Sequence, residues 1–227
     1  MHNVDTVELQ TGAAPIGSVI WLHGLGADGH DFEPIVTELQ LPDSLPLRFV
    51  FPHAPVRPVT INGGMEMRAW YDIVSLDADG RSDEQGIRES SEILDALIQR
   101  EIERGIESDR IVIAGFSQGG AIVLHNALRN SHKFAGMMAL STYLPLPKTI
   151  DAEVDDVADA GDTSLPVFMA HGTFDPMIPY QGGRHSAARL EQLGYRVDWH
   201  EYPMAHGVCP QEISDIRDWL LSVYDAG

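Results

Sequence analysis

One serine stands between glycines at the point where a strand-like run gives way to a helix-like run. The segment at residues 113–120 reads IAGFSQGG and contains a G-x-S-x-G motif centred on Ser117. In this motif the serine occupies a sharp strand-to-helix turn that exposes its hydroxyl at the carboxyl end of a sheet. The alternative is a tight turn without chemistry. We interpret Ser117 as a candidate nucleophile, because the motif lies after a predicted strand and before a predicted helix.

A serine hydroxyl needs a base to accept its proton, and the base needs a carboxylate to orient it. In proteins with this turn, the three residues follow one another along the chain in the order serine, acid, histidine. The base is therefore expected among the histidines that follow Ser117. These are His125, His132, His171, His185, His200 and His206.

His206 has the position that a base requires. It lies between a predicted strand at residues 197–202 and the predicted last helix at residues 212–224, in the segment MAHGV. A loop at the carboxyl end of a strand brings an imidazole to the same edge of the sheet as Ser117. His125 is instead expected in a buried helix, and His200 lies within a strand.

Asp175 is the predicted acid. It follows a predicted strand in the segment VFMAHGTFDPMIP, residues 167–179, and precedes two prolines that stiffen the chain. The alternative is a turn-forming aspartate ahead of Pro176. The chain order Ser117, Asp175, His206 favours the catalytic interpretation over Asp198, which lies within a strand.

Acyl transfer also requires two backbone N–H donors for the oxyanion. The first expected donor is the amide of Gln118, directly after the nucleophile, at the start of a helix whose dipole favours negative charge. The second is expected in the early loop HGLG, residues 23–26, which follows a buried strand. We assign it to Leu25, and we expect His23 to hold this loop by a hydrogen bond.

Short apolar runs alternate with helix-like stretches along the whole chain. Strands are expected at residues 18–22, 47–51, 111–114, 134–140, 166–170 and 197–202, and helices at 31–40, 84–104, 118–129, 183–193 and 212–224. This alternation predicts an α/β fold with a mainly parallel central sheet and helices on both faces. Residues 4–10 are expected to add an antiparallel edge strand. We find no break in composition, so we expect a single domain over residues 1–227.

The composition restricts the possible partners. The formal net charge is −19, with only two lysines among 15 basic residues, so we expect no nucleic acid partner. No segment approaches the ~20 apolar residues of a membrane helix, which predicts no stable membrane insertion. The start of the chain lacks a basic and an apolar signal region, and there is one cysteine, Cys209; both indicate a cytoplasmic protein.

Much of the acidic charge lies in one run at residues 151–162, DAEVDDVADAGD. We interpret this run as a solvated surface loop between two core segments. The alternative, a metal site, is disfavoured because the carboxylates of the run do not follow the pattern of a central glycine and a terminal glutamate that a calcium loop has. The sequence indicates no metal and no organic cofactor.

Several segments together resemble the phospholipase/carboxylesterase family of α/β-hydrolases, which includes bacterial carboxylesterases and acyl-protein thioesterases. In chain order these are WLHGLGADGHDF, FPHAP, RAWYDI, AGFSQGGA, LSTYLP, HGTFDPMIP and YPMAHGVCPQEI. The resemblance covers nearly the whole chain. It implies the α/β-hydrolase fold, a triad of Ser117, Asp175 and His206, and an oxyanion hole at the amides of Leu25 and Gln118.

The resemblance also implies that NGGMEMRAWYDI, residues 62–73, lies beside the site. This long segment shows little regular pattern, and its large apolar side chains could line an acyl pocket. We expect Met65, Trp70 and Met177 to bind substrate. For Trp70 alone, packing into the core is an equal alternative.

The predicted activity is two-step hydrolysis of short- to medium-chain carboxylic esters through an acyl-enzyme. The nearest alternative is an acyl-protein thioesterase or a lysophospholipase with the same triad. A dienelactone-type hydrolase would carry cysteine at position 117, and a non-catalytic receptor would usually lack a member of the triad. The substrate is a small-molecule ester or thioester, and the family resemblance makes a homodimer an option that the sequence leaves open.

Overall fold

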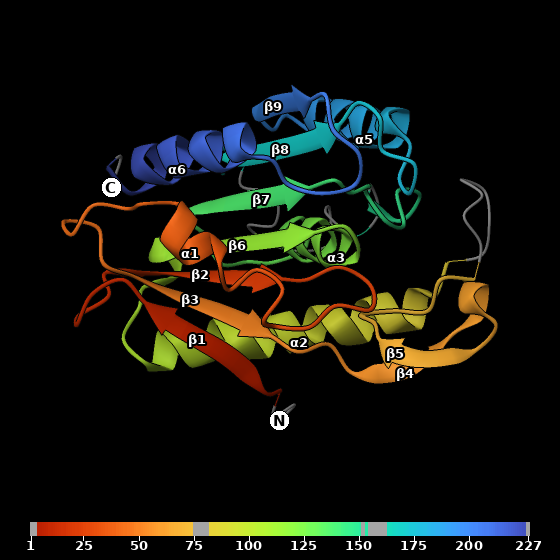
Figure 1. Cartoon of the computed structure of the whole chain (residues 1–227), viewed down its shortest axis with the longest axis horizontal. Helices are drawn as coiled ribbons and strands as arrows, with labels where there is room; N and C mark the ends of the chain where they lie inside the picture. Colours follow the sequence, from red (N-terminus) through yellow and green to blue (C-terminus); the bar gives the residue numbers. More distant parts are fainter. Residues whose placement is uncertain (1–3, 75–81, 151–152, 154–162, 226–227) are drawn as a thin grey trace.

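A seven-stranded sheet forms the centre of the molecule (Figure 1), in the order β1-β3-β2-β6-β7-β8-β9. The computed structural model describes residues 4–74, 82–150, 153 and 163–225. The strands are β1 (Thr6–Gln10), β2 (Gly17–Leu22), β3 (Leu47–Pro52), β6 (Ile111–Phe116), β7 (Gly136–Leu140), β8 (Val167–Gly172) and β9 (Val197–Tyr202). β1 pairs antiparallel with β3 at one edge, and all other neighbours are parallel. The predicted mainly parallel sheet and its antiparallel first strand are both confirmed.

Helices cover both faces of the sheet (Figure 1). They are α1 (Ile35–Glu38), α2 (Glu84–Glu103), α3 (Gln118–Ala127), α5 (Tyr180–Gln192) and α6 (Pro210–Asp225). α2, α3 and α5 pack on one face, and α1 and α6 on the other. Within the described ranges, no helix is both long and apolar enough to cross a bilayer.

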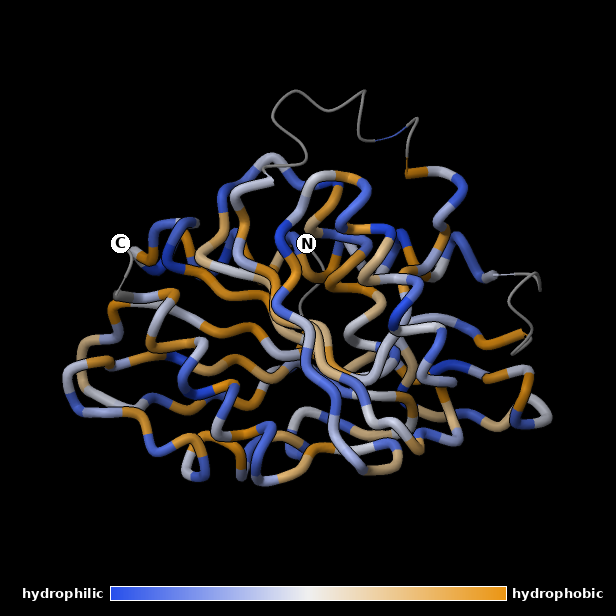
Figure 2. Tube along the Cα trace, turned by 90° about the horizontal axis from the view of Figure 1, so that it is seen from above, coloured by the Kyte–Doolittle hydropathy of each residue, from blue (hydrophilic) through white to orange (hydrophobic). Residues whose placement is uncertain are grey.

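The strands are apolar on both faces because each face is covered by helices. Along β2, Ile20 and Leu22 belong to the core beneath α2 and α3, whereas Val19 and Trp21 belong to the core beneath α1 and α6. In Figure 2 the apolar residues are accordingly concentrated along the strands and on the inward sides of the helices. Both cores thus hold the carboxyl ends of the strands in fixed positions.

Two segments differ from the sequence-based expectation. The helix predicted at residues 31–40 is reduced to α1, because Pro34 cannot donate a backbone hydrogen bond and the residues before it form i to i−3 turns instead. The segment at residues 62–73, for which no regular structure was predicted, contributes a strand to an antiparallel hairpin. This hairpin consists of β4 (Val56–Val59) and β5 (Met65–Arg68), joined through a 3₁₀ turn at Thr60–Asn62.

Most of the acidic run at residues 151–162 lies outside the described residues. Its one described member is Glu153, whose carboxylate pairs with Arg129 at 2.6 Å and also with Arg88. These two arginines come from α3's carboxyl end and from α2, so Glu153 joins the two helices at the surface. The interpretation of the rest of the run as a surface loop stays a prediction.

Glu212, in the first turn of α6, is a buried acid inside the core rather than at the site. Burial is the main cause that raises the pKa of Glu212 to about 8; a hydrogen bond from the Cys209 backbone lowers it in part, and the charge of Asp215 raises it. Glu212 is therefore neutral in the folded protein near pH 7, whereas its pKa is about 4.5 in the unfolded chain.

We expect Glu212→Gln to stabilise the protein at alkaline pH. A folded-state pKa above the unfolded value gives a contribution that is complete below about pH 4.5 and is lost as the pH rises through 8. The glutamine does not ionise, so the free energy of unfolding in urea should exceed that of the wild type by about 2–4 kcal/mol at pH 9. The difference should nearly vanish at pH 5. The exposed Glu191→Gln on α5 is the matched control, and two parallel pH curves for Glu212→Gln and the wild type would contradict the prediction.

Candidate active site

Ser117 stands alone between β6 and α3 in a strained backbone conformation. Its φ is 54° and its ψ is −119°, a combination that costs a non-glycine residue about 1–3 kcal/mol. Its N–H donates to the carbonyl of Leu140 at 2.8 Å, and its own carbonyl accepts from the Thr142 hydroxyl at 2.6 Å. Leu140 is the last residue of the neighbouring β7 and Thr142 lies two residues beyond it, so β7 and the segment that follows it hold the turn.

The glycines of the motif are required by close approach. A Cβ built on Gly115 would lie 2.4 Å from the Gly119 carbonyl carbon, and a Cβ built on Gly119 would lie 2.4 Å from the carbonyl oxygen of Leu22. The start of α3 therefore rests directly against the ends of β6 and β2. This contact places the Ser117 hydroxyl at the carboxyl edge of the sheet.

The three residues predicted from chain order meet in space. His206 Nε2 lies 2.9 Å from Ser117 Oγ, and His206 Nδ1 lies 2.6 Å from Asp175 Oδ2. The Asp175 carboxylate is fully buried and its other oxygen, Oδ1, accepts from the amides of Met177 at 2.8 Å and Ile178 at 2.9 Å. An ionised carboxylate in this position keeps the proton of His206 on Nδ1, which leaves Nε2 free to accept the serine proton.

His171 is a further residue of the site, and the sequence analysis did not assign it a role. It lies in β8, with Nε2 donating to the carbonyl of Ile178 at 2.9 Å and lying 3.6 Å from Asp175 Oδ2. Burial is the main cause that lowers the pKa of His171, so the ring is neutral and holds the loop after Asp175 as a hydrogen-bond donor. Its place at the carboxyl end of a strand, four residues before Asp175, was the signal in the sequence.

The loop at residues 23–26 runs beside the serine. A Cβ built on Gly24 would lie 3.4 Å from Ser117 Cβ. Neither the Leu25 amide nor the Gln118 amide donates to another backbone group in the parts of the chain that the structure describes, and the first residue of a helix has no intrahelical acceptor for its N–H. Both amides can therefore serve a developing oxyanion.

His23 fixes this loop, as the sequence analysis expected. Its Nδ1 donates to the Gly24 carbonyl at 2.7 Å, and its Nε2 accepts from the Ala54 amide at 3.0 Å. Burial lowers the pKa of His23 to about 4. The ring is thus neutral at physiological pH, which is the protonation state that both hydrogen bonds need.

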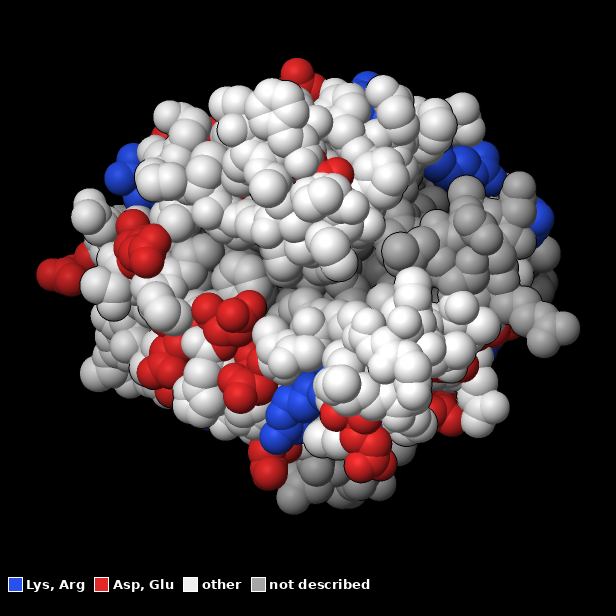
Figure 3. Space-filling view, turned by 45° about the vertical axis from the view of Figure 1, so that its right-hand side comes forward, with Lys and Arg blue, Asp and Glu red and all other residues white. Residues whose placement is uncertain are grey.

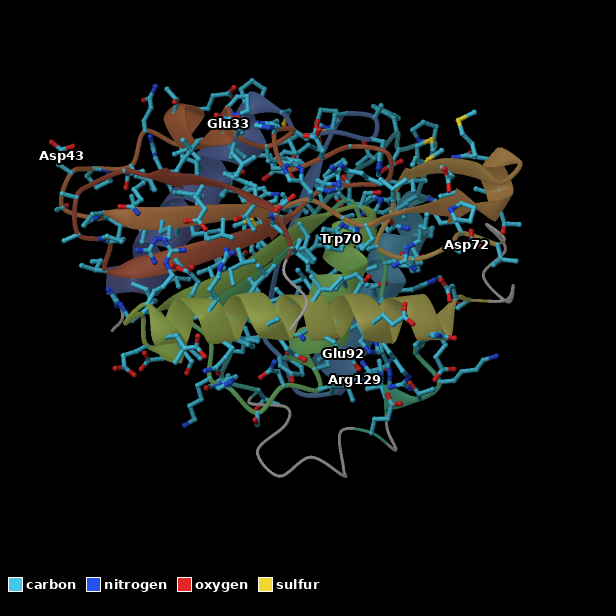
Figure 4. All side chains as sticks on the ribbon, turned by 90° about the horizontal axis from the view of Figure 1, so that it is seen from below. Glu33, Asp43, Trp70, Asp72, Glu92 and Arg129 are labelled. Atoms are coloured by element: carbon cyan, nitrogen blue, oxygen red, sulfur yellow. The ribbon has the colours of Figure 1, made fainter. Side chains whose placement is uncertain are left out.

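The three residues expected to bind substrate lie in different surroundings. The Met65 and Met177 side chains are 64% and 58% exposed and are free to contact a ligand. Trp70 is 0% exposed and lies inside the molecule between α2 and the sheet (Figure 4), so it has no free surface for an acyl chain. The prediction that Trp70 binds substrate is therefore wrong, and the alternative of packing into the core holds. Phe174, 71% exposed and adjacent to Asp175, is an apolar side chain that the sequence analysis missed.

The net charge is unevenly displayed on the surface. On the face drawn in Figure 3, acidic side chains gather on one side, next to a broad area without charged groups. Across the described segments, no three histidine, cysteine, aspartate or glutamate side chains are grouped so as to hold a metal ion.

Comparison with known proteins decides the family. The model of the phospholipase/carboxylesterase family matches residues 7–223. The chain belongs to this family. The family is one of serine hydrolases with the α/β-hydrolase fold, and both the suspected family and the predicted enzyme class are confirmed.

Relatives of this family member include acyl-protein thioesterases. Acyl-protein thioesterase 1 of Cryptococcus neoformans is 41% identical over 226 residues, which cover 92% of each chain. Acyl-protein thioesterase 1 of Neurospora crassa is 41% identical over 210 residues, which cover 89% of this chain and 85% of the relative. The crystal structure of Zea mays acyl-protein thioesterase 2 superposes with a TM-score of 0.87 at 25% identity, covering 97% of this chain and 99% of the other.

We expect Asp175→Asn in this hydrolase to remove most of the activity while preserving the loop. The asparagine oxygen can still accept from the Met177 and Ile178 amides, but the side chain no longer holds the required tautomer of His206. The kcat for an ester substrate should fall about 10⁴-fold. The matched control is Asp198→Asn, because Asp198 pairs only with His200 on β9 among the contacts described. Equal activity of the two variants would contradict the role of Asp175.

Proposed function

We propose that this protein hydrolyses acyl thioesters, and oxygen esters of the same acyl chains, through an acyl-enzyme at Ser117. The observation that carries the hydrolytic reaction is the hydrogen-bonded chain from Ser117 through His206 to Asp175. The thioester preference is supported by the relatives named acyl-protein thioesterase at 41% identity. We place it ahead of the first sequence-based prediction, a carboxylesterase for short- to medium-chain esters.

The reaction proceeds in two steps. His206 Nε2 accepts the proton of Ser117 as the hydroxyl oxygen attacks the acyl carbonyl, and the carbonyl oxygen becomes an oxyanion beside the amides of Leu25 and Gln118. The tetrahedral adduct collapses, and His206 returns the proton to the departing thiolate or alkoxide. Water then attacks the acyl-enzyme by the same route and releases the carboxylic acid. The chemistry calls for no metal or organic cofactor.

We assign the acyl chain to exposed apolar side chains on the β4–β5 hairpin and on the loop around Asp175. Met65 belongs to β5 of the hairpin, and Met177 and Phe174 belong to the loop around Asp175. Flexible thioethers adapt to acyl chains of different length. The proposed partner is thus a small-molecule or protein-linked thioester; the cytoplasmic location and the homodimer remain predictions.

A substrate panel tests the function. Wild-type protein should cleave S-palmitoyl and S-octanoyl thioester peptides with a higher kcat/KM than p-nitrophenyl acetate. For each substrate, the kcat of Ser117→Ala should be at least about 10⁴-fold lower than that of the wild type. Ser222→Ala, on the exposed side of α6, is the matched control. A lysophospholipid completes the panel. A preference for the short oxygen ester would favour the carboxylesterase interpretation, and a preference for the lysophospholipid would favour a lysophospholipase.

A second prediction concerns the acyl contacts. Met65→Ser and Met177→Ser should each reduce kcat/KM for a dodecanoyl ester by about 3- to 10-fold, because a buried methylene contributes about 0.8 kcal/mol. The acetyl ester, which is too short to reach them, should be cleaved at the wild-type rate. Ile16→Ser is the control. Ile16 is also exposed, but it directly precedes the amino end of β2, whereas the site lies at the carboxyl ends of the strands. An equal loss for both chain lengths would exclude an acyl contact.

A further inference from the structure

We propose that Trp70 is a positioning residue that fixes the two halves of the oxyanion hole relative to each other. The proposal rests on the proposed function, since it concerns the amides of Leu25 and Gln118 as donors to the oxyanion. These amides belong to two segments far apart along the chain, a loop after β2 and the start of α3. Trp70 is hydrogen-bonded to both segments.

The first contact is with Gln118. The Trp70 backbone N–H donates to Gln118 Oε1 at 2.8 Å, and Gln118 Nε2 donates to the carbonyl of Tyr71 at 2.7 Å. The amide side chain is buried and uses both of its ends on two consecutive residues. Gln118 is thereby held from the side by the segment that carries Trp70, while its own backbone N–H stays free.

The second contact is with the early loop. The indole Nε1–H of Trp70 donates to the carbonyl of His23 at 2.9 Å, and the two rings lie 5.3 Å apart. The His23 carbonyl is two residues before Leu25. A neighbouring bond, from the Gly26 amide to the Arg68 carbonyl at 2.9 Å, ties the far side of the same loop to β5.

Trp70 is itself fixed by the structure around it. The Ser90 hydroxyl of α2 donates to the Trp70 carbonyl, and the Ala69 amide before it donates to Pro55 at 3.0 Å. In the view of Figure 4, Trp70 accordingly lies in the interior next to α2. Each polar group of Trp70 thus has a partner, and two of the three partners belong to the segments of the proposed hole.

Trp21 shows what a tryptophan that only packs looks like in this protein. It is as deeply buried as Trp70 and stacks on Phe32, yet its Nε1–H finds no hydrogen-bond partner among the described residues. An oxyanion hole needs donors within about 2.7–3.1 Å of the oxygen as it becomes charged, so a shift of one segment weakens one donor. A side chain bonded to both segments opposes that shift.

The test compares Trp70→Phe with Trp21→Phe. Both changes remove an indole N–H and the same volume from the core, but only the first breaks a hydrogen bond. For a p-nitrophenyl ester we expect kcat of Trp70→Phe to fall about 10- to 100-fold with KM unchanged, less than the 10²–10³-fold loss of a whole donor. Trp21→Phe should stay within about 3-fold of wild type, while both lose similar stability in urea.

A transition-state mimic separates positioning from stability. The mimic is a medium-chain alkyl trifluoromethyl ketone. The Ser117 oxygen adds to the carbonyl carbon of the ketone, the serine proton moves to His206, and the ketone oxygen becomes the oxyanion. Its affinity for Trp70→Phe should weaken by the same factor as kcat/KM. The affinity for the fatty acid product should remain at the wild-type value, because the acid forms no oxyanion.

Gln118→Met is the second variant. If Trp70→Phe does not fold, Gln118→Met by itself tests the proposal. It keeps the Gln118 backbone amide but removes the bonds to Trp70 and Tyr71, so it should show the same fall in kcat at unchanged KM. The double variant should lose less than the product of the two single losses, because both act through one hole. Wild-type rates for Gln118→Met, or equal rates for Trp70→Phe and Trp21→Phe, would overturn the inference. Failure of the proposed function is distinguishable, because a fluorophosphonate probe would then leave wild-type Ser117 unlabelled.

Discussion

The backbone of Ser117 is the constraint on which the rest of the structure depends. A non-glycine residue at φ 54° persists only where its surroundings impose that conformation. Here Leu140 at the end of β7 and Thr142 just after it bind the two backbone groups of Ser117, and Gly119 packs against the carbonyl of Leu22 without room for a side chain. The order of the strands follows from this requirement, because β2 and β7 must both lie beside β6 to make these contacts. Contacts with the sheet therefore hold Ser117 in its strained backbone conformation.

Buried polar groups lie at both ends of the parallel strands, and the two sets differ in charge. At the carboxyl ends of the strands, His23 and His171 are buried and neutral, since burial lowers the pKa of both. His23 bonds backbone groups through both ring nitrogens, and His171 donates from Nε2 to the carbonyl of Ile178. A second cationic imidazole beside Asp175 would compete for the carboxylate that orients His206. At the amino edge, the buried carboxylate of Glu101 accepts from Ser18 at 2.6 Å and from Arg48 at 2.8 Å. The ion pair of Glu101 and Arg48 thus lies at the amino ends of the strands, whereas the rings of His23 and His171 at the carboxyl ends are neutral.

The sequence predicts the sheet and the meeting of Ser117, Asp175 and His206 because each follows a strand with a clear apolar pattern. Parallel strands bring their carboxyl ends to one edge, so chain order alone determines which residues can meet. The β4–β5 hairpin was not predictable in the same way, since its strands are short, one contains a proline, and few of their side chains are buried. The position of Trp70 depends on that hairpin and on α2 together, which no local pattern encodes. Its burial therefore became known only from the structure.

The groups that react and the groups proposed to select the substrate lie in different parts of the site. Asp175 and the supporting residues His23, His171 and Gln118 are buried, and Ser117 and His206 are partly buried, whereas Met65, Met177 and Phe174, which we propose as contacts of the acyl group, are exposed. A rigid interior allows little variation, because each glycine of the motif lies within 2.4 Å of another backbone atom when given a Cβ. Exposed side chains on a hairpin and a loop can change without disturbing those contacts. On this basis, substitutions at these exposed positions would alter substrate choice and leave the hydrogen-bonded chain from Ser117 through His206 to Asp175 in place.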